Sequence, residues 1–388
     1  MSDSDIRLLI YSPLSLRMGG GGDRWLVEIA PRLKKRGIQP TIFATDFIAK
    51  SYRANPTNWF VDQITNAGIR YQENISSPIS NLVNTPLMRS KSLAALSREM
   101  AQHDITYFMN AYILQDISIW LAMRLAQQPP VISAQHSTII QDSRLHNAYM
   151  LSVTRMLLRV FDAYHVLNRE DYATYCSWGL TPAYLIPNGV DTKRFAPAVS
   201  KDNSQFTVLF AGRLDYQKGV DTILEAVRHL EQENERNIVY KICGTGPLRK
   251  EVQKFAESRP NVHYLGYVPD DELVQLYKTA SLFLMPSRRE TFGLVALEAM
   301  ASGTPVVVTD ISGPRTFVRE SFGRMVPPTD SKALADTIQW FYRLFLEHPD
   351  DLETMAKNAR DICVKEFDWE SVADKLSVMI KSVVAEGE

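Results

Sequence analysis

The chain has 388 residues, of which 45% are apolar and 22% charged, a composition typical of a soluble globular protein with room for two domains. The first 190 residues carry 18 Lys and Arg against 14 Asp and Glu, whereas the remainder carries 25 against 30, for a net charge of -1. This mild balance excludes the strongly basic character of a nucleic-acid-binding protein. The three cysteines are scattered, which favours a reducing compartment over a disulfide scaffold.

The N-terminal segment and the short apolar runs of the sequence favour a cytoplasmic location. No apolar run reaches the roughly 18 residues of a transmembrane helix. The start, MSDSDIRLLI, lacks the basic region and long apolar core of a secretory signal. The DSD at Asp3–Asp5 imitates a metal-binding DxD, but it lies in a segment expected to fray, and we interpret it as a chance match.

Short β-rich runs alternate with helical stretches along the whole chain. In the first half these runs are residues 7–13, 40–47, 69–73, 105–111, 130–137, 163–168 and 183–188. In the second half they are residues 206–214, 238–244, 261–266, 282–287 and 305–310. Many are continuously apolar, as parallel strands covered on both faces are. With helices such as 219–233 and 270–280 between them, they predict two doubly wound α/β domains, with a boundary near 186–205.

The first candidate ligand site follows the first strand, in SPLSLRMGGGGDRW. Gly19 to Gly22 allow a ligand to approach the backbone at a helix N-terminus, where free N–H groups favour an anion. The loop matches neither GxGxxG nor GxxxxGK[ST], so a dinucleotide or P-loop site is poorly supported. A plain flexible turn is the alternative.

Three further loops follow strands, where ligands bind in open α/β sheets. In AGRLDYQKGVD, Arg213 and Lys218 flank a turn into a helix and would suit a diphosphate, although a solvated basic loop is equally consistent. Gly244 and Gly246 form a tight turn in CGTGP. His136 ends an apolar strand and is a candidate for the cleft, although a lone histidine is more often structural.

The most informative stretch is SRRETFGLVALEAMASGTPVV. Glu290 lies in a strand-to-helix loop, beside backbone N–H groups that the helix start leaves unpaired. Those groups belong to Phe292, Gly293, Leu294 and Val295. They suit an anion, with Glu290 beside it to accept hydrogen bonds from hydroxyl groups.

Glu298 lies about two turns further along a helix that is apolar on all sides, so we expect it to be buried. A buried carboxylate is costly unless it is hydrogen-bonded or paired. Either a ligand hydroxyl or an ion pair with Arg288 or Arg289 would compensate it.

Together these segments resemble the retaining glycosyltransferases of family 4, which have the GT-B fold. The resemblance rests on the glycine loop with LVEIAPRLKKRG, His136, and the motifs IPNGVDTKRF, AGRLDYQKGVD, GTGP, LGYVPDDELVQLYKTASLFLMPS, ETFGLVALEAMASGTPVVVTD, GRMVPPTDSKALADTI and FDWESVADKL. They run in order over nearly the whole chain. The pair Glu290 and Glu298 around FGL is the most specific of them.

The resemblance implies two Rossmann-like domains that face each other across a cleft. The first, residues 1–190, would hold the acceptor, and the second, residues 191–368, the nucleotide-sugar. A C-terminal helix, residues 369–388, would cross back to the first domain. Neither a metal nor another cofactor is implied, since the nucleotide-sugar is a substrate.

The resemblance also implies a role for each matched residue. Arg213 and Lys218 would bind the donor diphosphate, Glu290 the hydroxyls of the transferred sugar, and Glu298 the ribose. The remaining positions would be Phe292, Gly293, Leu294 and Val295 at the sugar and distal phosphate, Gly20 and Gly21 approaching the phosphates from the first domain, His136 at the reacting face of the sugar, and Gly244, Tyr267 and Val268 on the donor side, with backbone near Tyr264–Val268 reading the base.

Some positions depart from the family pattern. Asp23 stands where Glu is usual after the glycines, and Gly22 lengthens the glycine run. After DISG, where the family often has a glutamate, this chain has Arg315 and Thr316. These changes bear on donor and acceptor details and leave the fold expectation intact.

The expected reaction is transfer of a hexose from a UDP- or GDP-linked sugar to a hydroxyl of a glycan, glycolipid or small metabolite, with retention at the anomeric carbon. An epimerase or a sugar phosphorylase of the same fold, and a nucleotide-sugar-binding protein without activity, are the alternatives. The basic segment RLKKRG (32–37) with Arg144, Arg155 and Arg159 leaves two interpretations open. One is peripheral contact with the inner membrane surface, and the other is an ordinary basic helix end.

Overall fold

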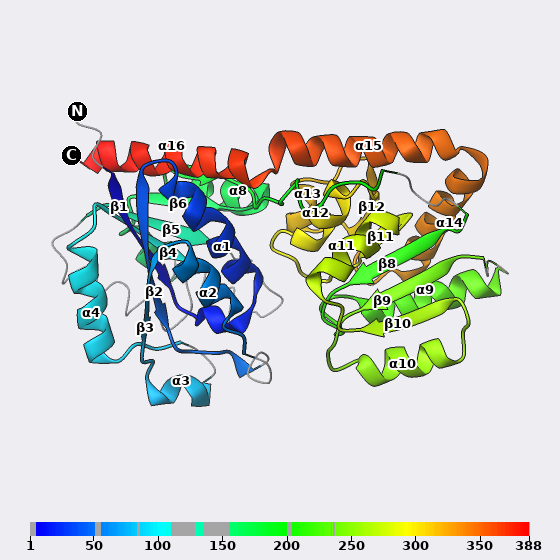
Figure 1. Cartoon of the computed structure of the whole chain (residues 1–388), viewed down its shortest axis with the longest axis horizontal. Coiled ribbons are helices and arrows are strands. Elements are labelled where there is room, and N and C mark those ends of the chain that lie inside the picture. Colours follow the sequence, from blue (N-terminus) through cyan, green and yellow to red (C-terminus); the bar gives the residue numbers. More distant parts are fainter. Residues whose placement is uncertain are drawn as a thin grey trace. The chain divides into compact units, whose positions relative to one another are not determined.

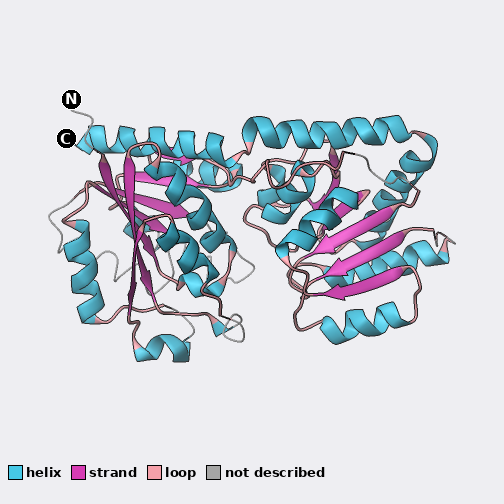
Figure 2. Cartoon of the chain, viewed as in Figure 1, coloured by secondary structure: helices cyan, strands magenta, loops and turns pink. Residues whose placement is uncertain are grey.

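The computed structural model describes residues 5–50, 56–83, 86–109, 129–135, 152, 155–199, 204–233, 235 and 237–387. The chain divides into two compact units. Unit 1 comprises residues 1–187 and 372–388, and unit 2 comprises residues 188–371. The chain therefore passes between the units twice, and Figures 1 and 2 show the elements of each unit.

Unit 1 is built on a parallel sheet in the order β3-β2-β1-β4-β5-β6-β7. Its strands are β1 (Ile6–Ser12), β2 (Ile38–Thr45), β3 (Arg70–Asn74), β4 (Ile105–Met109), β5 (Val131–Gln135), β6 (Ala163–Val166) and β7 (Ala183–Leu185). Its helices are η1 (Leu16–Met18), α1 (Gly21–Lys34), α2 (Trp59–Asn66), α3 (Pro78–Val83), α4 (Ser90–Met100), α7 (Arg155–Leu158), α8 (Arg169–Ser177) and most of α16 (Trp369–Gly387).

Unit 2 is built on a second parallel sheet, in the order β10-β9-β8-β11-β12-β13. Its strands are β8 (Thr207–Ala211), β9 (Val239–Cys243), β10 (Val262–Gly266), β11 (Leu282–Met285), β12 (Val306–Thr309) and β13 (Gly323–Val326). Its helices are α9 (Val220–Gln232), α10 (Arg249–Glu257), α11 (Asp270–Thr279), α12 (Leu294–Ala301), α13 (Ser312–Arg315), α14 (Ser331–Glu347) and α15 (Pro349–Glu366).

In chain order, the six strands of unit 2 are arranged 3-2-1-4-5-6, the doubly wound order in which the winding reverses between the first and fourth strands. That reversal lies between β8 and β11. The predicted fold class is confirmed, and each β-rich run predicted from the sequence contains a strand. The sequence analysis missed β13, because GRMV is short and its Arg324 interrupts the apolar pattern.

Helices cover both faces of the unit 2 sheet because its strands are apolar on both sides. On one face, side chains of α9, α10 and α14 pack in a single core with Tyr240 and Ile242 of β9. On the other face, the ring of Tyr277 from α11 lies 5.5 Å from that of Phe283 in β11. Fully burying each large apolar side chain contributes about 1.5–3 kcal/mol, so the two cores hold the sheet rigid and its loops in place.

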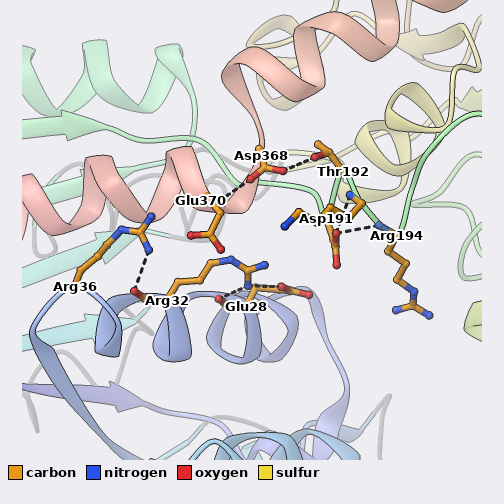
Figure 3. Close-up of polar contacts among 9 residues, drawn as sticks. Glu28, Arg32, Arg36, Asp191, Thr192, Arg194, Asp368 and Glu370 are labelled. Atoms are coloured by element: carbon orange, nitrogen blue, oxygen red, sulfur yellow. Dashed lines mark hydrogen bonds and ion pairs between the residues drawn. The ribbon is translucent and has the colours of Figure 1, made fainter.

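The two segments that leave unit 2 are tied to each other inside that unit. The backbone N–H of Val190 donates to Phe367 O at 2.7 Å, and the Thr192 hydroxyl donates to the Asp368 carboxylate (Figure 3). The other carboxylate oxygen of Asp368 accepts from the N–H of Glu370 at 2.8 Å. Both exits from the unit are therefore fixed at one place.

Among the helices that the structure describes, none combines the length and the apolar character needed to span a membrane.

Gly219, which precedes α9, has φ +71, and a Cβ at this position would lie 2.0 Å from the carbonyl oxygen of Pro286. Gly266 in the same unit has nearly the same φ, +69, but its Cβ would meet nothing closer than 3.9 Å. We expect Gly266→Ala to cost about 1 kcal/mol of unfolding free energy, from backbone strain alone. Gly219→Ala should cost about 3 kcal/mol, because the loop must also move away from Pro286. Urea denaturation of both variants measures the difference, and equal losses would contradict the close approach of the two loops.

Candidate active site

The loops that follow β8 and β11 meet at the reversal point of the unit 2 sheet (Figure 1). Lys218 lies in the first loop and Glu290 in the second, and the Lys218 Nζ lies 2.5 Å from Glu290 Oε2. Both side chains are partly exposed, at 28% and 16%. The structure thus brings together two residues that are 72 positions apart and that the sequence analysis assigned to one site.

Asp215 organises the loop after β8. One of its carboxylate oxygens accepts from the backbone N–H of Lys218 at 2.9 Å, and the other lies 2.6 Å from Arg213 Nη2. The carboxylate therefore closes the turn and orients the arginine at the same time. Asp215 is not among the residues predicted from the sequence, although an aspartate at the first position of a turn is a recognisable turn signal.

The loop after β9 packs against this turn. Leu214 donates its backbone N–H to Thr245 O at 2.8 Å, and the N–H of Gly244 donates to Gly266 O at 2.6 Å. The Tyr264 hydroxyl donates to Gly244 O at 3.1 Å. Gly244 therefore lies beside the end of β10, where the side chain of Tyr267 is 74% exposed and that of Val268 is half-buried.

The start of α12 lies next to Glu290. Gly293 precedes the helix with φ +110, and a Cβ there would lie 2.7 Å from the methyl group of Met285. The N–H groups of Ala296 and Leu297 donate to Gly293 O. Those of Leu294 and Val295 come earlier in the helix and have no helical carbonyl behind them. Phe292 is buried and fixes this loop to the core.

Glu298 is buried, with 5% of its surface exposed, as the sequence analysis predicts. The Tyr277 hydroxyl of α11 donates to Glu298 Oε2 at 3.0 Å. The alternative pairing with Arg288 is wrong, because Arg288 forms a two-pronged ion pair with Asp221 instead. Tyr277 is a partner that the sequence analysis missed, since only the fold brings α11 beside α12.

In unit 1, Gly20 and Gly21 stand at the start of α1, as expected. Asp23 accepts a hydrogen bond from the N–H of Gly20 at 2.9 Å and is itself buried. Burial raises the pKa of the Asp23 carboxyl to about 6, although the N–H groups of Gly20 and Gly19 oppose that shift. His136 and Arg144 lie outside the described residues.

Arg315, where the family often has glutamate, pairs with Asp310 at the end of β12, with Nε 2.6 Å from Oδ1. Among the described residues, no three His, Cys, Asp or Glu side chains are grouped as metal ligands.

Two doubly wound units, with cations and a helix start at the reversal point of the second sheet, define a protein of the nucleotide-binding α/β class. The sequence profile of the glycosyl transferases group 1 matches residues 191–379, and that of glycosyltransferase family 4 matches residues 19–194. Together the two profiles cover nearly the whole chain. The chain belongs to the family 4 glycosyltransferases, and the resemblance seen in its motifs is confirmed.

Individual relatives agree with this assignment. A glycosyltransferase of Methanocaldococcus jannaschii is 32% identical over 183 residues, which is 46% of this chain and only 45% of that protein. The phosphatidyl-myo-inositol mannosyltransferase of Mycobacterium leprae is 26% identical over 98% of both chains. The crystal structure of Anabaena HepE in complex with UDP and glucose matches with a TM-score of 0.74 and 19% identity, over 97% of this chain and all of that one. This last likeness shows the GT-B fold.

The buried carboxyl of Asp23 predicts a pH dependence of stability. Its pKa in the folded protein, about 6, lies above the value near 4 of an unfolded chain, so the folded state binds the proton more tightly. The resulting stabilisation is fully present below pH 4 and is lost as the pH rises through 6. Asp23→Asn keeps the size of the side chain and removes the carboxyl whose titration gives this stabilisation. Between pH 7 and pH 4, we expect wild type to gain about 2 kcal/mol of unfolding free energy over Asp23→Asn. Urea denaturation across this range measures the gain, and parallel pH profiles for the two proteins would rule it out.

Proposed function

We propose that the protein transfers a hexose from a UDP- or GDP-linked sugar to an acceptor hydroxyl, with retention at the anomeric carbon. The observation that carries the proposal is the 2.5 Å contact between Lys218 and Glu290 at the reversal point of the sheet. There, a cation that would bind a diphosphate lies next to a carboxylate that would accept hydrogen bonds from sugar hydroxyls. The names of the relatives support the donor class, since one is a mannosyltransferase and another was crystallised with UDP and glucose.

The donor would lie along the carboxyl edge of the unit 2 sheet. Arg213 and Lys218 would bind the diphosphate, together with the N–H groups from Phe292 to Val295 at the start of α12. Glu290 would accept hydrogen bonds from the sugar. Since a guanidinium has five N–H donors and an ammonium three, both cations can keep their carboxylate partners and still bind phosphate oxygens.

The ends of the nucleotide would lie further along the same edge. Glu298 would accept hydrogen bonds from the ribose hydroxyls. Gly244, Tyr267 and Val268 line the end of the sheet where the base would bind. From unit 1, Gly20 and Gly21 would approach the phosphates. The N–H of Gly20 already donates to Asp23, so Gly21 is the freer of the two. His136 would stand at the reacting face of the sugar.

Catalysis would be mainly electrostatic. As the bond between the sugar and the diphosphate breaks, the leaving diphosphate would gain negative charge, and Arg213, Lys218 and the start of α12 would stabilise it. The acceptor would attack from the face that the diphosphate leaves, with a phosphate oxygen taking its proton. These protein cations supply the positive charge, so the proposal includes neither a metal nor a cofactor.

The acceptor is proposed only as a glycan, a glycolipid or a small metabolite. Contact with a membrane would need free cations on unit 1. Within the basic segment 32–37, however, Arg32 pairs with Glu28 (Figure 3). Lys34 donates to Gly68 O, and Arg36 pairs with Asp374. Two of the four cations of this segment are therefore paired with carboxylates, which makes a lipid surface the weaker part of the proposal.

Lys218→Ala and Arg213→Ala test the diphosphate assignment. UDP or GDP should raise the thermal unfolding temperature of wild type, and transfer from the corresponding sugar should then be measurable. Each substitution should lower kcat by about 10²–10³, the loss typical of a group that stabilises developing negative charge. Each should also reduce the thermal shift. Lys250→Ala on the exposed face of α10 is the control and should change neither. Near-normal rates in the two site variants would refute the assignment.

Glu290→Ala and Glu298→Ala should fail in different ways. Glu290 would contact the sugar and not the nucleotide, so its loss should chiefly lower kcat while the nucleoside diphosphate still binds. Glu298 is buried beside Tyr277, so its loss should chiefly weaken nucleotide binding or lower the unfolding temperature. Calorimetric titration with UDP or GDP, alongside kinetics, separates the two effects. The same kinetic defect in both variants would show that the division is wrong.

A further inference from the structure

Arg288 joins the two loops that carry Lys218 and Glu290. Its Nη1 lies 2.9 Å from Asp221 Oδ1 and its Nη2 lies 2.6 Å from Oδ2, so the ion pair is bidentate. The same Nη1 donates to the carbonyl oxygen of Tyr216. Its backbone N–H donates to Gln217 O at 2.8 Å. Arg288 therefore contacts the loop after β8 through both its backbone and its side chain.

These contacts lie close in sequence to Lys218 and Glu290 but do not involve the side chains of those two residues. Arg288 precedes Glu290 by two residues, and Asp221 follows Lys218 by three, in the first turn of α9. Both side chains of the pair are about one quarter exposed, so water screens the interaction only in part. Three hydrogen bonds fix the orientation of the planar Arg288 guanidinium, whereas an ion pair with a single contact would leave the side chain free to rotate.

We propose that Arg288 and Asp221 are positioning residues. Their ion pair, called the clasp below, sets the position of Glu290 relative to Lys218. The inference rests on the proposed function, because it assigns Glu290 to the sugar and Lys218 to the diphosphate. Arg288 directs three of its five N–H donors to Asp221 and Tyr216, so we assign it to the loop and not to the donor. Lys218 keeps a second support in the Asp215 carboxylate. Buried Phe292 anchors the loop after Glu290, and the clasp holds it before Glu290.

A kinetic cycle tests the clasp. Arg288→Gln and Asp221→Asn should each lower kcat about 10²-fold, since a shift of about 1 Å in a positioned group costs this much. The Kd of UDP or GDP should change by less than about 3-fold, because the nucleotide-binding groups stay in place. The double variant should lose no more than either single variant, as for two residues that act as one unit. Arg288→Lys should recover part of the loss, since lysine keeps the charge without the bidentate geometry.

Arg228→Gln is the matched control, because it removes an arginine from α9 that pairs with Glu225 on the surface. It should leave kcat unchanged. Nucleotide affinity that falls in step with kcat in Arg288→Gln would overturn the proposal, since Arg288 would then contact the donor. Fully additive losses in the double variant would also overturn it. If Arg288→Gln does not fold, Asp221→Asn replaces it, and a nucleotide affinity that falls in step with kcat in that variant would overturn the proposal.

Hydrogen exchange in the absence of any donor separates this inference from the proposed function. Peptides that cover 287–293 and 214–219 should exchange about 10-fold faster in Arg288→Gln and Asp221→Asn, because local opening becomes easier. They should be unchanged in Arg228→Gln. If wild type shows no sugar transfer but these peptides respond, the proposed function fails and the clasp stands. Unchanged exchange in both clasp variants would overturn the clasp itself.

Discussion

The contact between the Lys218 ammonium and the Glu290 carboxylate depends on the direction of the strands beneath it. In a parallel sheet every strand delivers its following loop to the same edge, and at the reversal between β8 and β11 the two following helices depart to opposite faces. The two loops there contact each other through Lys218 and Glu290. Asp215 fixes the turn of the first loop, and the Arg288–Asp221 pair joins that loop to the second. The polar site therefore lies at the end of a sheet with a packed apolar core.

The two glutamates around FGL illustrate how one short segment serves two environments. Glu290 lies in a loop with one side open to solvent, whereas Glu298 lies two turns into α12, among side chains of the core. The carboxylate of Glu298 is tolerated there because the Tyr277 hydroxyl donates to it across the gap between α11 and α12. Helix α12 therefore begins beside the candidate site and continues into the core. Gly293, which precedes its first residue, sets its direction.

The sequence predicted the fold well because continuous apolar runs in a βα alternation have few other solutions. It also placed Arg213, Lys218 and Glu290 at one edge, since each follows a strand. It could not predict which cation pairs with which carboxylate. Arg288 is near Glu298 in the sequence, yet it pairs with Asp221, 67 positions earlier, because β8 and β11 are neighbours in the sheet. Tyr277 was missed for the same reason, and β13 was missed because an edge strand of four residues carries little pattern.

The carboxylates that accompany the cations have a consequence for how the product leaves. Arg213 and Lys218 each have an anionic neighbour from the chain, Asp215 and Glu290. Under the proposed function, a bound diphosphate would share those cations with an internal competitor, which would lower the net gain from binding it. The nucleoside diphosphate product would carry more charge than the donor and would otherwise be held most tightly of all. An internal anion that pairs with the cation again as the nucleotide departs would therefore favour release, the step that limits turnover in many enzymes.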